Sequence, residues 1–110
     1  MTKIIVKYDK SLCSFIELSG HANYADYGHD IVCSGITAAT YTSINLIDKL
    51  AKDCFKLTVK EEAGYLRIDL DYQSLEQNVV EMIQLIVKNL IDMYEEMKRN
   101  YPKNLKIEIL

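Results

Sequence analysis

The residues of this sequence best suited to chemistry are a histidine and a cysteine that lie twelve positions apart, His21 and Cys33. A cysteine attacks a carbonyl as its thiolate, so it needs a base within hydrogen-bonding reach or an environment that favours the charged form. The N-terminus of a helix and a neighbouring imidazolium are two such environments. The pair therefore indicates nucleophilic thiol catalysis, with Cys33 as the nucleophile and His21 as its base; the alternative is that Cys33 is a buried structural cysteine, a common role for a free cysteine on a helix.

The elements on either side of this pair would hold it in place. A β-prone run over residues 13–19 ends directly before Gly20 and His21. Functional residues are common at strand ends because the sheet holds them rigidly. A helix is predicted over residues 31–51, where apolar residues recur at helical spacing. Cys33 would then lie in the first turn, where free backbone N–H groups could stabilise the oxyanion of a peptide-bond attack.

Two neighbours of Cys33 leave alternatives open. Asp30 could be the N-cap of the predicted helix, a third catalytic residue that orients His21, or a carboxylate that opposes thiolate formation. The N-cap is the leading interpretation. His29 lies only four residues before Cys33 and is an alternative base. His21 is preferred because a strand end is a firmer platform than a loop.

The other cysteines bear on redox state and metal binding. The chain has three cysteines, which is an odd number, and their spacing matches no disulfide-bonded framework. This pattern indicates reduced thiols rather than disulfides. A metal site that combined His21, His29 and Cys33 with Cys13 or Cys54 would contain no C-x-x-C pair and no regular ligand spacing. We therefore expect no metal and no cofactor, with Cys13 and Cys54 in the core.

Residues 22–29 show neither helical nor strand periodicity and form either a lid over bound substrate or a surface connection. Small polar residues and two tyrosines make up this segment, and small residues also open the helix that follows. The candidate substrate-binding residues are Tyr24, Asp26, Tyr27, Gly28 and Ser34. A lid of this kind would order only when the correct peptide binds.

The pattern G-H-A, a short loop and then G-H-D-I-V-C-S-G resembles the ribosomal-processing cysteine protease Prp family of bacteria. The resemblance covers the length of the chain as well as the motif. It implies Cys33 as nucleophile, His21 as base, and Gly20 and Asp30 as supporting residues. The family more often has serine four residues after the cysteine, and Thr37 keeps the hydroxyl here.

The resemblance also implies an activity. A thiol protease of this family is a hydrolase that acts in ribosome biogenesis. It removes a short N-terminal extension from one large-subunit ribosomal protein, just after an aromatic-containing stretch. The partner would be that extended ribosomal protein as a peptide substrate, and the resemblance further suggests a homodimer.

Composition agrees with a single globular domain over residues 1–110. The chain is 49% hydrophobic and 26% charged, and its net charge is −3. An acidic balance argues against nucleic-acid binding and suits a basic protein partner. No apolar run approaches the roughly 20 residues that span a bilayer, so we expect a cytoplasmic protein with no membrane contact. The alternative function is a non-enzymatic ribosome-associated or assembly factor that binds a basic protein.

The remaining periodicities predict the fold class. Strands are expected at residues 3–8, 13–19, 54–60, 65–71 and 105–109, and helices at residues 31–51 and 74–99. The order ββαββαβ predicts an α+β single domain, with an antiparallel-rich sheet of about five strands and two helices packed on one face. Within the third strand, Phe55, Leu57 and Val59 are expected to point inward.

The second helix carries two further signals. Ser74 and Gln77 have the spacing of a capping box, which would begin the helix at Ser74. Its apolar face is wider than two helices on one sheet should bury, and the surplus residues are Leu75, Met82, Leu85, Ile91 and Met93. A leftover apolar patch on a helix predicts a homodimer.

Overall fold

The computed structural model describes residues 1–20 and 27–110, with side chains described from residue 31 onward in the second range. The elements run in the order β1 (Thr2–Asp9), β2 (Leu12–Ser19), α1 (Tyr27–Leu50), β3 (Phe55–Lys60), η1 (Glu61–Ala63), β4 (Tyr65–Leu70), α2 (Gln77–Asn100) and β5 (Leu105–Ile109). Apart from the short 3-10 turn η1, this is the predicted order ββαββαβ. The α+β class is confirmed.

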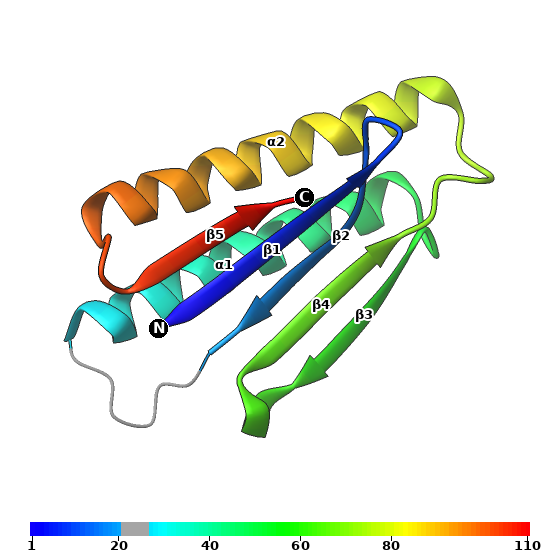
Figure 1. Cartoon of the computed structure of the whole chain (residues 1–110). Helices are drawn as coiled ribbons and strands as arrows, with labels where there is room; N and C mark the ends of the chain where they lie inside the picture. Colours follow the sequence, from blue (N-terminus) through cyan, green and yellow to red (C-terminus); the bar gives the residue numbers. More distant parts are fainter. Residues whose placement is uncertain (21–26) are drawn as a thin grey trace.

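All strands join one five-stranded sheet in the order β3-β4-β2-β1-β5. Both helices cover the same face of this sheet (Figure 1). The pairs β1–β2, β2–β4 and β3–β4 are antiparallel, whereas β1–β5 is parallel. The parallel pair arises because β5 returns to the sheet after the long crossover through α2. The sheet is therefore mixed, although most of its pairs are antiparallel as predicted.

The core lies between the sheet and the two helices. Alternate residues of β1, such as Ile4 and Val6, are fully buried on the helix side, as the strand periodicity predicts. Between the helices, the buried Tyr94 hydroxyl lies 2.6 Å from the Thr40 hydroxyl oxygen. A Cβ added at Gly35 would lie 2.8 Å from the Met97 methyl carbon, so this glycine allows a close approach of α1 and α2.

Both helices begin at other residues than the sequence predicted. Because α1 begins at Tyr27, Asp30 is its fourth residue and not its N-cap, and Cys33 lies in the second turn rather than the first. The helix α2 begins at Gln77, and Glu76 is its N-cap without a side-chain hydrogen bond. Gln77 thus occupies the first helical position instead of the third, and the predicted capping box does not form.

The apolar residues of the edge strand β3 point to the core side, as predicted, but two of them are not buried. Leu57 is 37% exposed and Val59 is 39% exposed, and only Phe55 packs against the core. Their side is nevertheless the core side, because Leu57 pairs with the buried Ile68 of β4. They are exposed because the two helices lie over β5, β1 and β2 and leave this edge uncovered (Figure 1).

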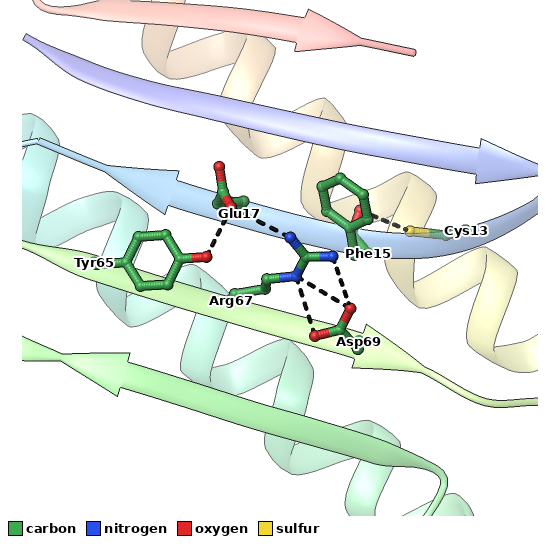
Figure 2. Close-up of polar contacts among 6 residues, drawn as sticks. All are labelled: Cys13, Phe15, Glu17, Tyr65, Arg67 and Asp69. Carbon is green, nitrogen blue, oxygen red and sulfur yellow. Dashed lines mark hydrogen bonds and ion pairs between the residues drawn. The ribbon is translucent and has the colours of Figure 1, made fainter.

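The sheet face opposite the helices is polar. Arg67 stands at the centre of a network there, shown in Figure 2. Its guanidinium lies 3.0 Å from an Asp69 carboxylate oxygen and 3.4 Å from Glu17, and it stacks 3.9 Å from the centre of the Phe15 ring. The Tyr65 hydroxyl donates to Glu17 over 2.7 Å. Paired charges of this kind fit a face that is open to water.

In the described part of the chain, neither helix combines the length and the apolar character that a membrane crossing requires.

Candidate active site

Cys33 is partly exposed and contacts a residue from the first strand. Its sulfur lies 3.2 Å from the Thr2 hydroxyl oxygen, a distance at which either group could donate the hydrogen bond. Thr2 is 6% exposed, and its backbone N–H donates to the Asn104 carbonyl oxygen over 3.0 Å. The start of β1 is therefore fixed in the sheet and holds a hydroxyl against the sulfur.

The Cys33 side chain opens into a cleft of about 470 Å³. One wall is the first half of α1, and the other is the turn between β3 and β4. The floor is formed by the ends of β1 and β2 together with Leu66. The residues that line the cleft are Thr2, Leu18, Ser19, Gly20, Cys33, Ile36, Thr37, Tyr41, Val59, Glu61, Glu62, Gly64, Tyr65 and Leu66. These segments gather at one end of the sheet (Figure 1).

Gly20 occupies a position in this cleft that no larger residue could take. Its φ is +152°, and a Cβ there would lie 2.7 Å from the Met1 carbonyl oxygen and 3.0 Å from the Thr2 Cα. Its own N–H donates to the Gly64 carbonyl oxygen over 3.0 Å. The end of β2 is thus fixed between the start of β1 and the β3–β4 turn, directly before His21 in the chain.

Several predicted site residues fall outside what the structure describes. His21, Tyr24 and Asp26 belong to the segment 21–26, which lies outside the described residues. Tyr27, Gly28 and His29 form the beginning of α1, so the last part of the predicted loop 22–29 is helical. The prediction of a loop is wrong for that part, and the rest of the candidate lid lies outside the described residues.

Two further predicted residues can be placed by the helix. Asp30 follows His29 within α1. Ser34 is exposed on α1 and is not among the residues that line the Cys33 cleft, whereas Thr37 is.

Cys33 lies six residues after the start of α1, beyond the four N–H groups that a helix leaves unpaired. The expectation that helix-start N–H groups beside Cys33 form the oxyanion site therefore fails.

The other two cysteines are core residues, as predicted. Cys13 is fully buried and Cys54 is 4% exposed. Burial raises the pKa of the Cys13 thiol to about 12 and also raises the pKa of Cys54. Cys13 lies opposite Tyr8 at the far end of β1 from Thr2, roughly 20 Å away at the rise of a β-strand. It is too distant to share a metal ion with Cys33.

The family model described as cysteine protease Prp matches residues 1–106 of this chain. The chain belongs to this family. The ribosomal processing cysteine protease Prp of Bacillus subtilis is 34% identical over 100 residues, which cover 91% of this chain and 88% of that protein. The enzyme of the same name from Staphylococcus aureus strain Mu50 is 27% identical over 107 residues, 97% of this chain and 96% of that protein.

Solved structures share the fold over the whole chain. The essential ribosomal processing protease Prp from S. aureus, crystallised with a substrate peptide, superposes with a TM-score of 0.85 at 21% identity and covers 100% of both chains. The same protease with a covalently linked product peptide gives a TM-score of 0.80 at 22% identity, again over 100% of both chains. Members of the Prp family are cysteine proteases, and this chain is one. The alternative of a non-enzymatic assembly factor is set aside.

Sequence reasoning did not identify several residues of the cleft. Thr2 comes from β1, and Tyr41 lies two turns along α1 from Cys33. Glu61, Glu62 and Tyr65 come from the turn between β3 and β4 and from the strand that follows it. No local motif marks any of them: strand pairing brings Thr2 and the β3–β4 turn beside Cys33, and the helix α1 carries Tyr41 to the same cleft.

Thiol alkylation provides a first prediction for this Prp family member. We expect iodoacetamide near neutral pH to label Cys33 at least tenfold faster than Cys13 and Cys54, since burial and raised pKa values protect the latter two. Mass mapping of peptides after timed labelling measures the three rates. Labelling of Cys13 or Cys54 at the rate of Cys33 would contradict the assignment of the reactive thiol.

A second prediction concerns the Thr2 hydroxyl. Thr2→Val keeps a β-branched residue in β1 but removes the hydrogen bond to the Cys33 sulfur. We expect kcat/KM for a peptide substrate to fall about tenfold, the size of one hydrogen bond to a group that becomes charged. Thr2→Ser is the matched control, because it keeps the hydroxyl and should restore most of the activity. Equal losses in both variants would indicate a packing role instead.

Proposed function

We propose that this cysteine protease is an endopeptidase that removes a short N-terminal extension from a large-subunit ribosomal protein in the cytoplasm. Cys33 is the nucleophile and His21 is the general base. The observation that carries the proposal is the cleft of about 470 Å³ that holds the partly exposed Cys33, since a peptide can reach the sulfur there. The relatives from B. subtilis and S. aureus carry the name of ribosomal processing proteases, which supports the substrate class.

The chemistry proceeds in two stages. His21 accepts the thiol proton, and the Cys33 sulfur attacks the scissile carbonyl carbon to form a tetrahedral intermediate. The imidazolium then protonates the amine that leaves, and a thioester remains on Cys33. Water, deprotonated by His21, hydrolyses the thioester and releases the acid product with the free thiol. Gly20, the residue before His21, lines the Cys33 cleft, which supports this pairing.

Asp30 remains a candidate supporting residue in this scheme. Its place within α1 removes the N-cap role and leaves the two electrostatic roles, orientation of His21 or opposition to the thiolate. We propose the first, since a carboxylate that orients a histidine also stabilises the imidazolium formed in each stage. Within the segment 21–29, Tyr24, Asp26, Tyr27 and Gly28 remain proposed substrate contacts.

The oxyanion of the intermediate needs hydrogen-bond donors within the cleft. Thr37 lies one turn after Cys33 in α1 and lines the same cleft, so its hydroxyl is one available donor. The Thr2 hydroxyl, whose oxygen lies 3.2 Å from the Cys33 sulfur, is a second available donor. Together they can replace the helix-start N–H groups, which are too far along the chain from Cys33.

The charge of the cleft fits a basic substrate. Glu61 and Glu62 are exposed on the β3–β4 turn and line the wall opposite Cys33. The chain as a whole carries a net charge of −3. Ribosomal proteins bind RNA and are commonly rich in lysine and arginine, so electrostatic attraction would favour their approach.

Intact mass spectrometry tests the proposed function. The enzyme is incubated with the large-subunit ribosomal proteins of the organism that encodes it, purified from cells depleted of the enzyme. We expect one protein to lose a short N-terminal peptide, and no loss when Cys33→Ser replaces the wild type. No change in any ribosomal protein would overturn the substrate class, and cleavage of many proteins would overturn the specificity.

We also propose that the protein is a homodimer, through the outer face of α2. Leu75 and Ile91 pack partly against the core, whereas three of the surplus apolar residues remain exposed. These are Met82 at 39%, Leu85 at 68% and Met93 at 48% exposure. An apolar stripe of this kind on a helix is a common origin of a two-fold interface.

Sedimentation measures the oligomeric state. At tens of micromolar, we expect a species of twice the 12.7 kDa chain mass for the wild type and a 12.7 kDa monomer for Leu85→Glu. Leu57→Glu is the control, because it places the same charge on an exposed leucine of β3, away from α2. A wild-type monomer at these concentrations would refute the dimer.

A further inference from the structure

The open face of the sheet is the side that neither helix covers (Figure 1). Directly paired residues of neighbouring strands point to the same side, so strand pairing arranges the side chains of this face in three rows. From β5 towards β3, the rows are Lys106, Lys3, Ser19, Tyr65 and Lys60; then Glu108, Ile5, Glu17, Arg67 and Thr58; and then, from β1, Lys7, Phe15, Asp69 and Lys56.

The charge of this face is opposite to that of the whole chain. The face holds six of the 13 lysine and arginine residues but only three of the 16 aspartate and glutamate residues. Its formal charge is therefore +3, and the rest of the chain carries −6. The acidic balance that argues against a nucleic-acid partner thus describes the rest of the molecule and not its open face.

The three acidic residues of the open face are already paired with cations of the same face. Glu17 and Asp69 pair with Arg67, and a Glu108 carboxylate oxygen lies 3.7 Å from the Lys3 ammonium nitrogen. The remaining lysines are exposed and form no ion pair with any described residue. These four lysines are Lys7, Lys56, Lys60 and Lys106.

The spacing of the four lysines favours an extended anion. Lys106 on β5 and Lys60 on β3 are separated by four strand spacings, roughly 19 Å at about 4.8 Å each. A single phosphate or carboxylate cannot contact lysines that far apart, whereas a polyanion can lie across all the strands. The open face therefore fits a charged polymer and not a small ion.

Aromatic rings among the charges narrow the kind of polymer. The Arg67 guanidinium stacks 3.9 Å from the centre of the Phe15 ring (Figure 2), and the Lys60 ammonium lies 5.9 Å from the centre of the Tyr65 ring. Nucleobases stack on aromatic rings and on guanidinium planes alike, so a base can extend the stack of Phe15 and Arg67. An acidic peptide supplies the charge but no base to stack, so the face fits a nucleic acid better.

We propose that the open face of the sheet binds a single-stranded RNA segment. The four lysines contact phosphates, and the stack of Phe15 and Arg67 holds a base that is free of a duplex. RNA is the occupant because the substrate is a ribosomal protein, so this choice rests on the proposed function. Cys33 belongs to α1 on the other side of the sheet, and bound RNA leaves its cleft accessible.

Fluorescence anisotropy with the wild-type protein tests the binding. The probe is a labelled dodecamer of uridylate, and a dodecamer of glutamate is the acidic peptide for comparison. We expect the logarithm of the RNA association constant to fall with the logarithm of KCl concentration at a slope of about −3, since each phosphate neutralised on a single strand contributes about −0.7. The glutamate peptide should bind at least tenfold more weakly, and equal binding of the two probes would overturn RNA as the occupant.

Two double variants with the same change in net charge locate the site. Lys7→Gln with Lys56→Gln should weaken RNA binding at least tenfold at low salt and make the slope about 1.4 shallower. Lys49→Gln with Lys88→Gln removes exposed lysines from α1 and α2 and should have little effect on either quantity. Equal losses in the two double variants, or no loss in the first, would overturn the open face as the site.

The stacking contact has its own variants. Phe15→Leu keeps an apolar side chain without a ring and should weaken RNA binding at least fivefold, the lower range for loss of one stacked base. The salt slope should stay the same, because stacking releases no counterions. Phe15→Tyr keeps the ring and should bind like the wild type. Unchanged affinity in Phe15→Leu, or equal losses in both variants, would overturn the stack.

The RNA face and the proposed function can fail separately, because the binding assay requires no cleavage. If the RNA binds as described but no ribosomal protein is trimmed, the open face stands and the ribosomal substrate is wrong. If a ribosomal protein is trimmed and the uridylate dodecamer does not bind, the protease function stands and the RNA face is wrong.

Discussion

Replacing Cys33 with serine is expected to abolish peptide cleavage and leave the fold intact. The serine hydroxyl has nearly the volume of the thiol and can still bond the Thr2 hydroxyl, which lies 3.2 Å from the sulfur. It lacks the acidity of a thiol, however, and a histidine base alone does not make it an equivalent nucleophile in a site shaped for sulfur. The rate should fall below detection, a loss of more than about 10⁴-fold.

The measurement is turnover of the trimmed ribosomal protein or a peptide that spans its cleavage site. Thermal melting of the same samples should show a Tm close to that of the wild type. Cys54→Ala is the matched control, because Cys54 is 4% exposed in the core and should affect Tm more than activity. Turnover by pure Cys33→Ser would rule out Cys33 as the nucleophile.

Replacing His21 with alanine is expected to lower kcat/KM at least ~10²-fold, the lower range for loss of a general base. The same substitution at His29 should cost far less. The position of His29 makes it a serious competitor for the role of base. His29 and Cys33 are four residues apart in α1, and positions four apart lie near one another on the surface of a helix. Both histidines therefore have to be tested side by side.

Rate measurements on the two alanine variants across pH distinguish the candidates. Loss of the base should remove the acid limb of the kcat/KM profile, because that limb reports protonation of the base in the free enzyme. We expect this limb to disappear in His21→Ala and to persist in His29→Ala. The reverse pattern would assign the base to His29.

Much of the architecture followed from the sequence alone. Alternation in β1 placed Ile4 and Val6 on the buried face, and a 3.6-residue period placed Ile83, Leu90 and Tyr94 of α2 in the core. These patterns are local consequences of strand and helix geometry, so they need no knowledge of neighbouring elements. The same reasoning put Cys33 on the helix that follows β2, although in its first turn instead of its second.

Element boundaries were less accurate for a physical reason. The first residues of α1, Tyr27 to His29, precede the apolar period that marks the rest of the helix, so the sequence placed its start at residue 31. At α2, the residues Ser74 and Gln77 match a capping box by spacing, but the helix begins at Gln77 with Glu76 as its cap. Several residues near a helix start can serve as caps, and packing selects one.

Tertiary structure alone decided the composition of the site. The sequence supplied Cys33 and Gly20, whereas Thr2 and Glu61 reach the cleft only because β1 pairs with β2 and β4 with β2. The pairing partners of a strand depend on contacts between distant segments, which no local pattern encodes. The same holds for β3, whose alternation correctly gave the core side of Leu57. Only its place at the edge of the sheet, with α1 packed mainly on α2 and β1, left that leucine exposed.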